Sequence, residues 1–353
     1  MAQLHLECKF LIKIPLYCWR HALLRVKLVS SMTTCWALTD YRPGTANQVL
    51  GVARATGFQL EEKTLHYNSF ADLPNYCMIG YGLRGIKKEH RNIFSAPYPD
   101  VVVSAGRRSA PVAAYIKARH PSVKLVHLMR PEWSQHIFDM IIMPRHDRAY
   151  QSSNIVTTLG APHILTDEML FSAHSRYPLN ADRFAQPYTL ICIGGKTSHG
   201  PFTIEDAKAL VQALAPFATT GTFLVTTSRR TSSALAHSIF EYINTQYPHI
   251  ILLHYMPEQG GDNPYYAWLA QADRVVVTAD SVSMVSEAAY TAKPLYCFAA
   301  KNNVSAKHQR FIEQMVEHGH VKSIKDYDPL WTTAVKLNEA GRIGAKIREL
   351  IQT

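Results

Sequence analysis

The chain has 353 residues, enough for two domains that each bury a hydrophobic core of their own. Hydrophobic residues make up 47% and charged residues 18%, a globular composition that excludes a disordered or fibrous protein. The formal charge of +10 favours an anionic partner, such as a phosphate-bearing ligand or an acidic membrane surface. Because this charge is spread along the chain and no zinc-finger or RNA-binding signature occurs, no nucleic-acid partner is expected.

The six cysteines are scattered, and none belongs to a Cys-x-x-Cys pair. This usage indicates a reducing compartment and no structural zinc site. Cys192 and Cys297 lie in apolar runs and are predicted to be small core residues. No apolar stretch approaches the ~18–20 residues that a membrane span needs.

Residues 1–31 form a basic N-terminal extension in which five Lys and Arg residues oppose only Glu7. The segment lacks the uninterrupted apolar core and the cleavage site of a signal peptide. Two interpretations stay open. It is a segment that binds a membrane surface, or it is an extension outside the fold, with translation starting at Met32.

Residues 32–165 are predicted to form a first domain, in which strands alternate with helices as in a parallel, doubly wound sheet. Asp40 and Arg42 follow the first predicted strand, Gly44 lies in the same turn, and Gly106 and Arg107 follow the third strand. Open α/β sheets bind ligands at such strand ends. The predicted strands are 34–38, 58–67, 100–105, 123–129 and 138–143, and the predicted helices are 45–56 and 109–120.

The same pattern restarts in a second predicted domain, residues 188–335, after a linker at 166–187 that is rich in proline and lacks clear periodicity. A last helix within 336–353 ends the chain. The predicted strands are 188–193, 221–226, 249–253, 274–278 and 294–298, and the predicted helices begin near 203, 232, 265, 281 and 305.

The stretch 280–288 directly follows an apolar, β-branched run typical of a buried parallel strand, and it opens a helix. Hydroxyls of Ser281 and Ser283, together with the first N–H groups of the helix, are a phosphate-binding arrangement. Glu287, one turn further on, suits a sugar hydroxyl. The alternative is that Ser281 or Ser283 only caps the helix.

Two more turns of the second domain carry groups that bind anions. Gly194-Gly195-Lys196 allows close backbone approach and adds a cation, although it lacks the full P-loop pattern. Ser228-Arg229-Arg230 offers fork-shaped guanidinium donors that match phosphate. Together the three turns predict a diphosphate site. The predicted donor-binding residues are Gly194, Gly195, Lys196, Ser228, Arg229, Asp280, Ser281, Ser283, Ser286 and Glu287.

Residues 226–231 and 263–288 resemble the mitochondrial fission ELM family. Asp40-x-Arg42-Pro43-Gly44-x-x-x-Gln48, Phe138-Asp139 and Pro144-x-His146-Asp147 are similar to the family more loosely, and the resemblance covers roughly residues 34–325. It implies a GT-B-like architecture of two Rossmann-like domains with a cleft between them. In such enzymes the C-terminal domain binds a nucleotide diphosphate-sugar, and the N-terminal domain binds the acceptor, with no metal or cofactor.

The resemblance implies a glycosyltransferase that acts on a saccharide or lipid-linked acceptor. The expected setting is cell-envelope saccharide synthesis in the cytoplasm, at the inner face of the membrane. Arg229 would stabilise the leaving diphosphate, and Asp40 is the candidate base, with His199 a second candidate. Asp40 could instead only cap its loop. The predicted acceptor-side residues are Arg42, Gly44, Gly106 and Arg107. A non-catalytic adaptor of the fission type and a sugar-nucleotide epimerase stay open as alternatives.

Overall fold

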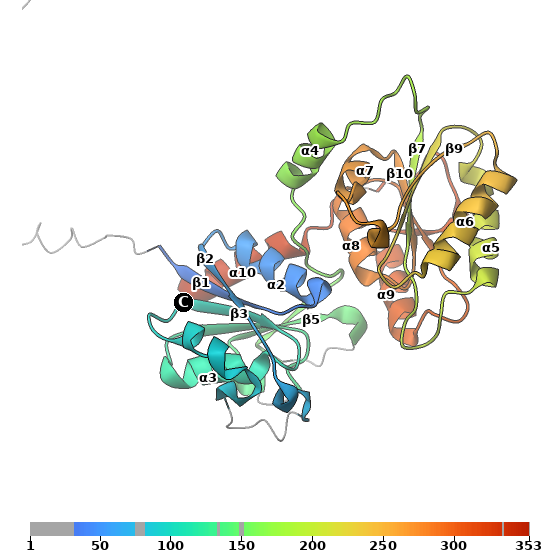
Figure 1. Cartoon of the computed structure of the whole chain (residues 1–353). Helices are drawn as coiled ribbons and strands as arrows, with labels where there is room; N and C mark the ends of the chain where they lie inside the picture. The colour runs from blue at the N-terminus through green and yellow to red at the C-terminus, as the bar shows by residue number, and fades with distance from the viewer. Residues whose placement is uncertain (1–31, 75–81, 133–134, 148–151, 334, 353) are drawn as a thin grey trace, which may run out of the picture. The chain divides into compact units, whose positions relative to one another are not determined.

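The computed structural model describes residues 32–74, 82–132, 135–147, 152–333 and 335–352. The predictions for residues 1–31 lie outside the described residues. From Thr34 onward the chain forms one compact unit that contains two separate six-stranded sheets (Figure 1). Every strand pair in both sheets is parallel, so the predicted fold class of two Rossmann-like, doubly wound domains is confirmed.

The first sheet has the strand order β2-β1-β3-β4-β5-β6. Successive residues of β1 point to opposite faces, so Cys35 packs on one side of the sheet and Trp36 on the other. Helix α3 covers the Trp36 face, and α2 and α10 cover the other (Figure 1). The strands are β1 Thr34–Thr39, β2 Gln59–Thr64, β3 Val101–Ala105, β4 Lys124–Leu128, β5 Met140–Pro144 and β6 Ile155–Thr158; the helices are α2 Pro43–Ala55 and α3 Ala110–Arg119.

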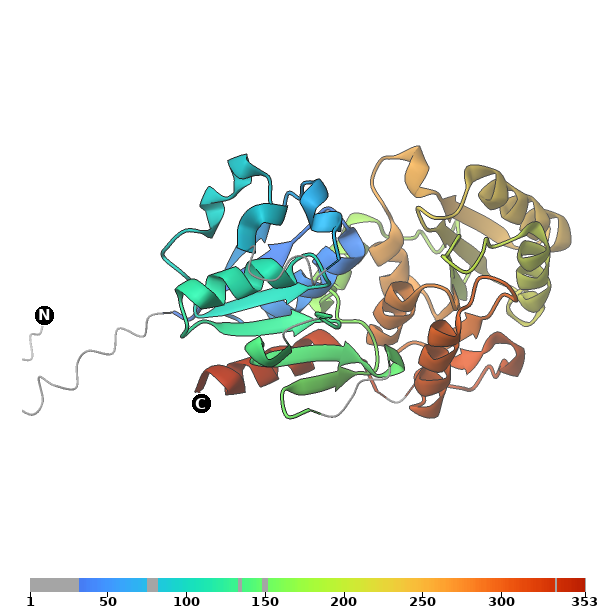
Figure 2. The same cartoon turned by 90° about the horizontal axis from the view of Figure 1, so that it is seen from below.

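The second sheet has the order β12-β11-β10-β7-β8-β9. Its faces are covered by α5 and α6 on one side and by α7, α8 and α9 on the other (Figure 2). The strands are β7 Tyr188–Ile193, β8 Thr222–Thr227, β9 Ile251–Tyr255, β10 Arg274–Thr278, β11 Leu295–Phe298 and β12 Lys322–Ser323. The helices are α5 Ile204–Ala213, α6 Ser233–Gln246, α7 Tyr265–Gln271, α8 Val282–Tyr290 and α9 Ala306–Glu317.

Among the described strands and α-helices, three were not predicted. Helix α4, Asp167–Arg176, lies within the predicted linker. None of its residues is buried, so its sequence lacks the apolar stripe by which a helix that packs on a core is predicted. Thr166 caps the N-terminus of this helix: its hydroxyl accepts the backbone N–H of Met169 at 3.2 Å. Strand β6 has four residues and β12 has two, too few for an alternating pattern.

The last helix, α10 (Glu339–Gln352), belongs to the core of the first sheet. Ile343 and Ile347 are fully buried there. Gly344 lies so close to α2 that a Cβ atom would approach the Ala55 carbonyl oxygen to 2.5 Å, and Arg348 Nη1 donates to the same oxygen at 2.8 Å. The chain therefore returns to its first domain after completing the second.

Both sheets have a point at which consecutive loops leave in opposite directions. In the first sheet β1 lies between β2 and β3, and in the second β7 lies between β8 and β10. Ligands of open α/β sheets bind outside the carboxyl ends of the strands at such a switch point. The topology therefore points to two edges: the loops after β1 and β3, and the loops after β7 and β10.

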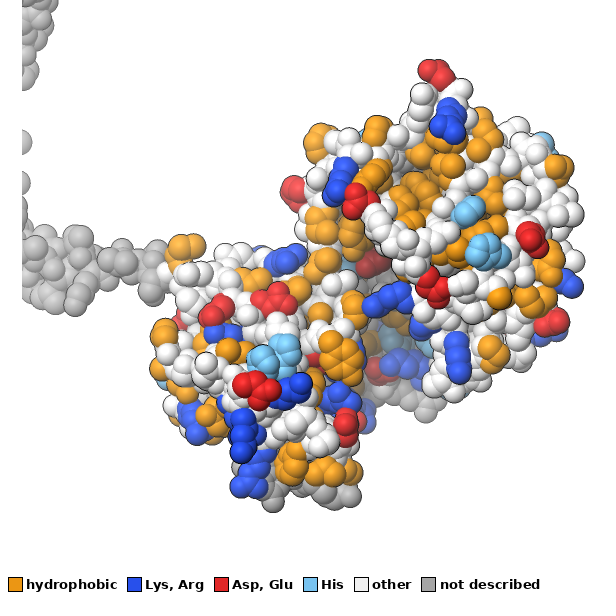
Figure 3. Space-filling model, in the orientation of Figure 1, with side chains coloured by type: hydrophobic (Ala, Val, Ile, Leu, Met, Phe, Trp, Pro, Cys, Tyr) orange, Lys and Arg blue, Asp and Glu red, His pale blue; other side chains and the backbone are white. Residues whose placement is uncertain are grey.

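Lys and Arg side chains are distributed over both halves and interspersed with Asp and Glu on the face that Figure 3 shows. No described helix is long and apolar enough to cross a membrane. Cys192 and Cys297 are buried, as predicted. Within the part of the chain that the structure describes, no group of three or more His, Cys, Asp or Glu side chains could hold a metal ion.

Candidate functional site

The three predicted anion-binding turns follow neighbouring strands. Gly194 and Gly195 come directly after β7, Ser228 directly after β8, and Asp280 two residues after β10. The order β10-β7-β8 places these turns side by side at the carboxyl edge of the second sheet. Gly194 N–H donates to the Thr278 hydroxyl at 2.7 Å, which ties the end of β7 to the end of β10.

Asp280 connects all three turns. Its Oδ2 atom accepts the backbone N–H of Gly195 at 2.9 Å and lies 2.9 Å from Arg230 Nη2. The carboxylate also faces Gly194, where a Cβ atom would meet Oδ2 at 2.0 Å, so only glycine fits. The Asp280 side chain is completely buried. These contacts give Asp280 a role in holding the turns together, and direct donor binding by this residue stays a prediction.

Arg230 belongs to the predicted Ser228-Arg229-Arg230 turn, although it was not among the predicted donor-binding residues. Its Nη1 atom donates to the Lys196 carbonyl at 3.0 Å, in addition to the ion pair with Asp280. The signal available in the sequence was the Arg229-Arg230 pair itself, but nothing in it indicates which arginine is committed to the fold.

Lys196 and Arg229 differ from Arg230 in that their charged groups are unpaired among the described residues. Both are exposed, and neither the Lys196 ammonium nor the Arg229 guanidinium has a hydrogen bond or ion pair to any described residue. An unpaired guanidinium beside glycine turns at a switch point is free to bind a phosphate bidentately. These two cations therefore supply the positive charge of the candidate site.

Some serine hydroxyls of the site have hydrogen-bond partners within the protein, and one has none among the described residues. The Ser228 hydroxyl accepts the Arg230 N–H at 3.2 Å, and Ser281 caps α8 by accepting the Met284 N–H at 3.5 Å. Ser281 thus has the capping role that was the alternative prediction. Ser283 is half-buried, and its hydroxyl has no partner among the described residues.

Ser286 lies on the second turn of α8 and is buried. Its hydroxyl accepts the Ala161 N–H at 2.9 Å and donates to the Val282 carbonyl at 2.8 Å. Ala161 belongs to the segment that follows β6 of the first sheet. Since the hydroxyl proton and a lone pair are both engaged, the contacts indicate that Ser286 anchors this segment, and a donor-binding role stays a prediction.

Glu287 is 7% exposed and accepts a hydrogen bond from the Tyr265 hydroxyl at 2.9 Å. Burial raises the pKa of Glu287 to about 7, and the hydrogen bond from Tyr265 opposes the rise. The carboxyl group can therefore hold or release a proton near neutral pH. Tyr265, on α7, was not predicted to be at the site.

The predicted acceptor-side residues meet at the switch point of the first sheet. Asp40 accepts from the backbone N, the Nε and the Nη2 of Arg42 at 3.0, 2.9 and 2.5 Å. This is the loop-capping contact considered as the alternative for Asp40, and the ion pair raises the pKa of Arg42. Gly106 has a left-handed backbone (φ +73°), and the atom nearest to its would-be Cβ is Arg42 Nη2.

The remaining predicted residues have fewer contacts. Arg107 Nη1 donates to the Leu73 carbonyl at 2.6 Å, and Gly44 is exposed with open space around it. His199 is exposed, and its Nδ1 atom lies 3.2 Å from the Ser198 hydroxyl. Asp40 follows β1 of the first sheet and His199 lies between β7 and α5 of the second, so the two candidate bases belong to different sheets.

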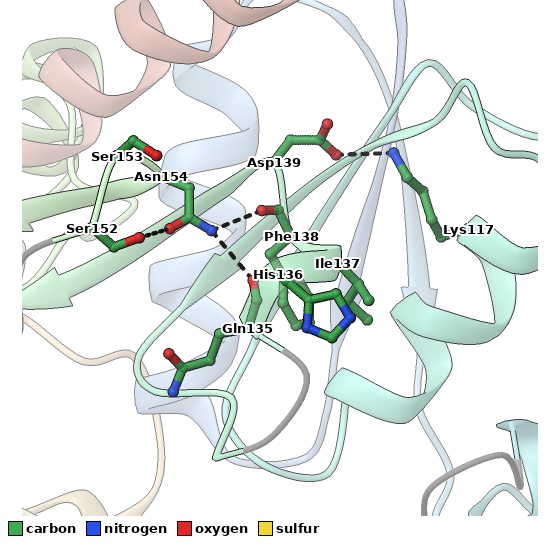
Figure 4. A pocket seen from close by; sticks show the side chains of 9 residues that line it. All are labelled: Lys117, Gln135, His136, Ile137, Phe138, Asp139, Ser152, Ser153 and Asn154. Carbon is green, nitrogen blue, oxygen red and sulfur yellow. Dashed lines mark hydrogen bonds and ion pairs between the residues drawn. The ribbon is translucent and has the colours of Figure 1, made fainter.

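A cavity of about 740 Å³ lies at the opposite, amino edge of the first sheet (Figure 4). It is lined by Lys117 of α3 and by residues that precede β5 and β6. Its polar side chains have partners within the lining: Lys117 Nζ pairs with Asp139 at 3.1 Å, and the Asn154 side chain donates to the backbone carbonyls of Gln135 and Phe138. None of the predicted site residues lines this cavity.

Comparisons with known proteins agree with this architecture. A structure of UDP-GlcNAc 2-epimerase from Methanocaldococcus jannaschii has a TM-score of 0.50 and 12% identity, covering 91% of this chain and 100% of that one. A co-structure of S. aureus MnaA with UDP has a TM-score of 0.50 and 13% identity over 91% and 88% of the chains. At such identities the likeness shows a shared GT-B-like fold.

Two curated proteins are similar in sequence. "Uncharacterized protein RP120" of Rickettsia prowazekii (strain Madrid E) is 31% identical over 318 residues, covering 80% of this chain and 88% of the relative. "Mitochondrial fission protein ELM1" of Arabidopsis thaliana is 27% identical over 293 residues, covering 75% and 67%. The family model described as "Mitochondrial fission ELM1" matches residues 43–351. The chain therefore belongs to the mitochondrial fission ELM1 family.

Proposed function

We propose that the protein is a glycosyltransferase that moves a sugar from a nucleotide diphosphate-sugar to an acceptor hydroxyl. The second sheet binds the donor at the carboxyl ends of β7, β8 and β10, and the first sheet binds the acceptor. The acceptor is a saccharide or lipid-linked compound of the cell envelope. The reaction takes place in the cytoplasm, at the inner face of the membrane.

One observation carries the proposal. Asp280 and Arg230 hold three glycine- and serine-bearing turns together, while Lys196 and Arg229 next to them remain exposed and unpaired among the described residues. A structural turn would not need two unpaired cations beside a helix N-terminus. A diphosphate does, because its charge must be balanced as it is bound and as it leaves.

The relatives support the same ligand class. One structural neighbour is a UDP-GlcNAc 2-epimerase, and another, MnaA, is a co-structure with UDP. Nucleotide diphosphates therefore fit the shared fold, and the candidate turns occupy its switch point. Glu287, buried beside Tyr265 one turn into α8, suits a ribose hydroxyl.

In the proposed reaction, the acceptor hydroxyl oxygen attacks the anomeric carbon of the sugar. The bond between that carbon and the diphosphate oxygen breaks, and negative charge develops on the diphosphate. Arg229 and the turn around Ser283 stabilise this charge. Asp40 is the proposed base for the acceptor proton, although in the free protein its carboxylate is paired with Arg42.

Product analysis and variant assays distinguish a glycosyltransferase from an epimerase and from a non-catalytic adaptor. Nucleoside diphosphate released only when an acceptor is present indicates transfer, whereas a change of the sugar without release indicates an epimerase. Asp40→Asn is expected to abolish turnover and to leave donor affinity unchanged. Turnover retained in this variant would remove Asp40 from the mechanism, and failure of the wild type to bind any nucleotide would favour a non-catalytic adaptor.

A further inference from the structure

Three arginines gather at the switch point of the first sheet. Arg42 follows β1, and Arg107 and Arg108 follow β3. Strands β1 and β3 are hydrogen-bonded neighbours. The chain leaves β1 toward β2 on one side and returns to β3 on the other, so the two turns lie next to each other at the switch point of the sheet. We call Arg42, Arg107 and Arg108 the arginine cluster.

Each guanidinium of the arginine cluster has at least one partner that holds it in place, and Arg108 has two, because its Nη1 also donates to the Tyr41 hydroxyl at 3.4 Å. Asp40 holds Arg42 through Nε and Nη2, and Asp72 accepts from Arg108 Nη2 at 2.5 Å. The Leu73 carbonyl accepts from Arg107 Nη1 at 2.6 Å. Side chains fixed in this way lose less conformational entropy when a ligand binds.

Donor groups of the cluster remain unused. Within the described residues, no acceptor contacts Arg42 Nη1 or Arg107 Nη2, and none contacts the backbone N–H groups of Arg107 and Arg108. The side of Gly106 that faces Arg42 is open, because no atom lies nearer than 4.0 Å to its would-be Cβ. These donors therefore point to a ligand that accepts several hydrogen bonds at once.

The arginine cluster carries an excess of positive charge. Arg42 pairs with Asp40 and Arg108 with Asp72, while Arg107 has no ion pair to a described residue, which leaves one positive charge in excess. Tyr67 lies beside Asp40 and beneath Arg108, whose Cζ is 5.5 Å from the ring centre. Burial and the Asp40 charge raise the pKa of Tyr67, so its hydroxyl keeps a proton and adds no negative charge.

We propose that the arginine cluster binds a phosphate or diphosphate group carried by the acceptor. The acceptor is then a phosphate ester, either a lipid with a phosphate headgroup or a soluble sugar phosphate. Planar guanidinium forks approaching from two turns match the tetrahedral oxygens of phosphate. This inference rests on the proposed function, because it assigns the chemical class of the substrate bound by the first sheet.

The test is a calorimetric titration of the full chain with inorganic pyrophosphate. The wild type is expected to show two sites. Arg229→Ala removes the donor site, and Arg107→Ala weakens the other site at least tenfold. Arg42→Lys, which keeps the charge but loses the fork, weakens that same site. Arg54→Ala is the matched control, because Arg54 is an exposed arginine near the end of α2, outside the cluster.

Pyrophosphate binding unchanged in both Arg107→Ala and Arg42→Lys would overturn the inference. The proposed donor site fails separately: it fails if Arg229→Ala keeps both sites. Circular dichroism of each variant shows that a lost site does not come from unfolding.

A second arm identifies the source of the phosphate. Co-sedimentation of the full chain is compared between vesicles of phosphatidylcholine and vesicles that also contain phosphatidic acid. Residues 1–31 are the same in every variant, so their contribution cancels. Binding to phosphatidic acid that falls in Arg107→Ala supports a lipid headgroup. Pyrophosphate binding that falls while vesicle binding is unchanged supports a soluble phosphate ester.

Discussion

The guanidinium of Arg230 contacts the buried carboxylate of Asp280 at 2.9 Å, although the two residues are 50 positions apart in the chain. The neighbouring Arg229 is exposed and unpaired among the described residues. Two adjacent arginines therefore have different roles. Arg230 holds the turns of the candidate site together, and Arg229 is the arginine that we propose binds the diphosphate.

Substitution of each arginine by alanine is expected to separate these roles. Arg230→Ala leaves a buried carboxylate without its cation and should lower the free energy of unfolding by about 1–3 kcal/mol. Arg229→Ala should change stability by no more than about 0.5 kcal/mol and abolish nucleotide binding. Urea titrations and nucleotide titrations of both variants check this. Equal stability losses in the two variants would contradict the assignment.

Gly194→Ala is expected to disrupt the turn after β7. Its Cβ atom would lie 2.0 Å from Asp280 Oδ2, so the carboxylate or the backbone must move, at a cost of about 1–3 kcal/mol. The matched control is Gly44→Ala, where no atom lies within 4 Å, and where stability should be unchanged or rise by up to about 1 kcal/mol. A melting temperature of Gly194→Ala equal to that of the wild type would show that the turn relaxes freely.

Ser286→Ala is expected to lower stability, and the nucleotide affinity of the variant tests the predicted donor-binding role of Ser286. The substitution removes the acceptor of the Ala161 N–H, and an unsatisfied buried donor costs about 1–3 kcal/mol. Unfolding in urea measures this loss, and a nucleotide titration measures affinity. Weaker nucleotide binding at unaltered stability would support Ser286 as a donor ligand and contradict its role as an anchor of the Ala161 segment.

The raised pKa of Glu287 predicts that the stability of the protein depends on pH. Its pKa is raised from the ordinary value of 4.5 to about 7, so between these values the folded state holds a proton that the unfolded state has released. The contribution of Glu287 to the free energy of unfolding is therefore largest below about pH 4.5. It is lost as the pH rises through 7, by about 3 kcal/mol in total.

Glu287→Gln removes this titration. The free energy of unfolding of the wild type should fall between pH 5 and pH 8 by about 2–3 kcal/mol more than that of the variant. The buried histidines titrate in both proteins, so their contributions cancel in the comparison. Parallel stability profiles over this range would show that Glu287 is ionised throughout.

The fold was largely predictable because buried parallel strands have a strong sequence signal. The run Arg274–Thr278 is apolar and β-branched, and it forms the strand β10 with the predicted bounds. Helix α4 was missed because it has no fully buried face, and its residues contact α7 only in the folded protein. Local patterns carry no information about such tertiary support.

The candidate site was predictable to the level of turns and not to the level of side chains. The glycine, serine and arginine turns were found because their residue types suit anions at strand ends. Whether a side chain is held by the fold depends on partners that are distant in the sequence. Arg230 pairs with Asp280, and the Ser286 hydroxyl accepts the Ala161 N–H. No local pattern distinguishes Arg229 from Arg230.

The most direct test of the proposed function is a thermal-shift titration of the full chain against UDP, GDP, CDP and ADP, with Arg229→Ala and Glu287→Ala as controls. A nucleotide at 100 times its Kd should add about 2.7 kcal/mol of stability to the wild type. The proposal predicts a shift with one nucleotide that is lost in both variants. No shift with any of the four would contradict a nucleotide-sugar donor and, with it, the glycosyltransferase.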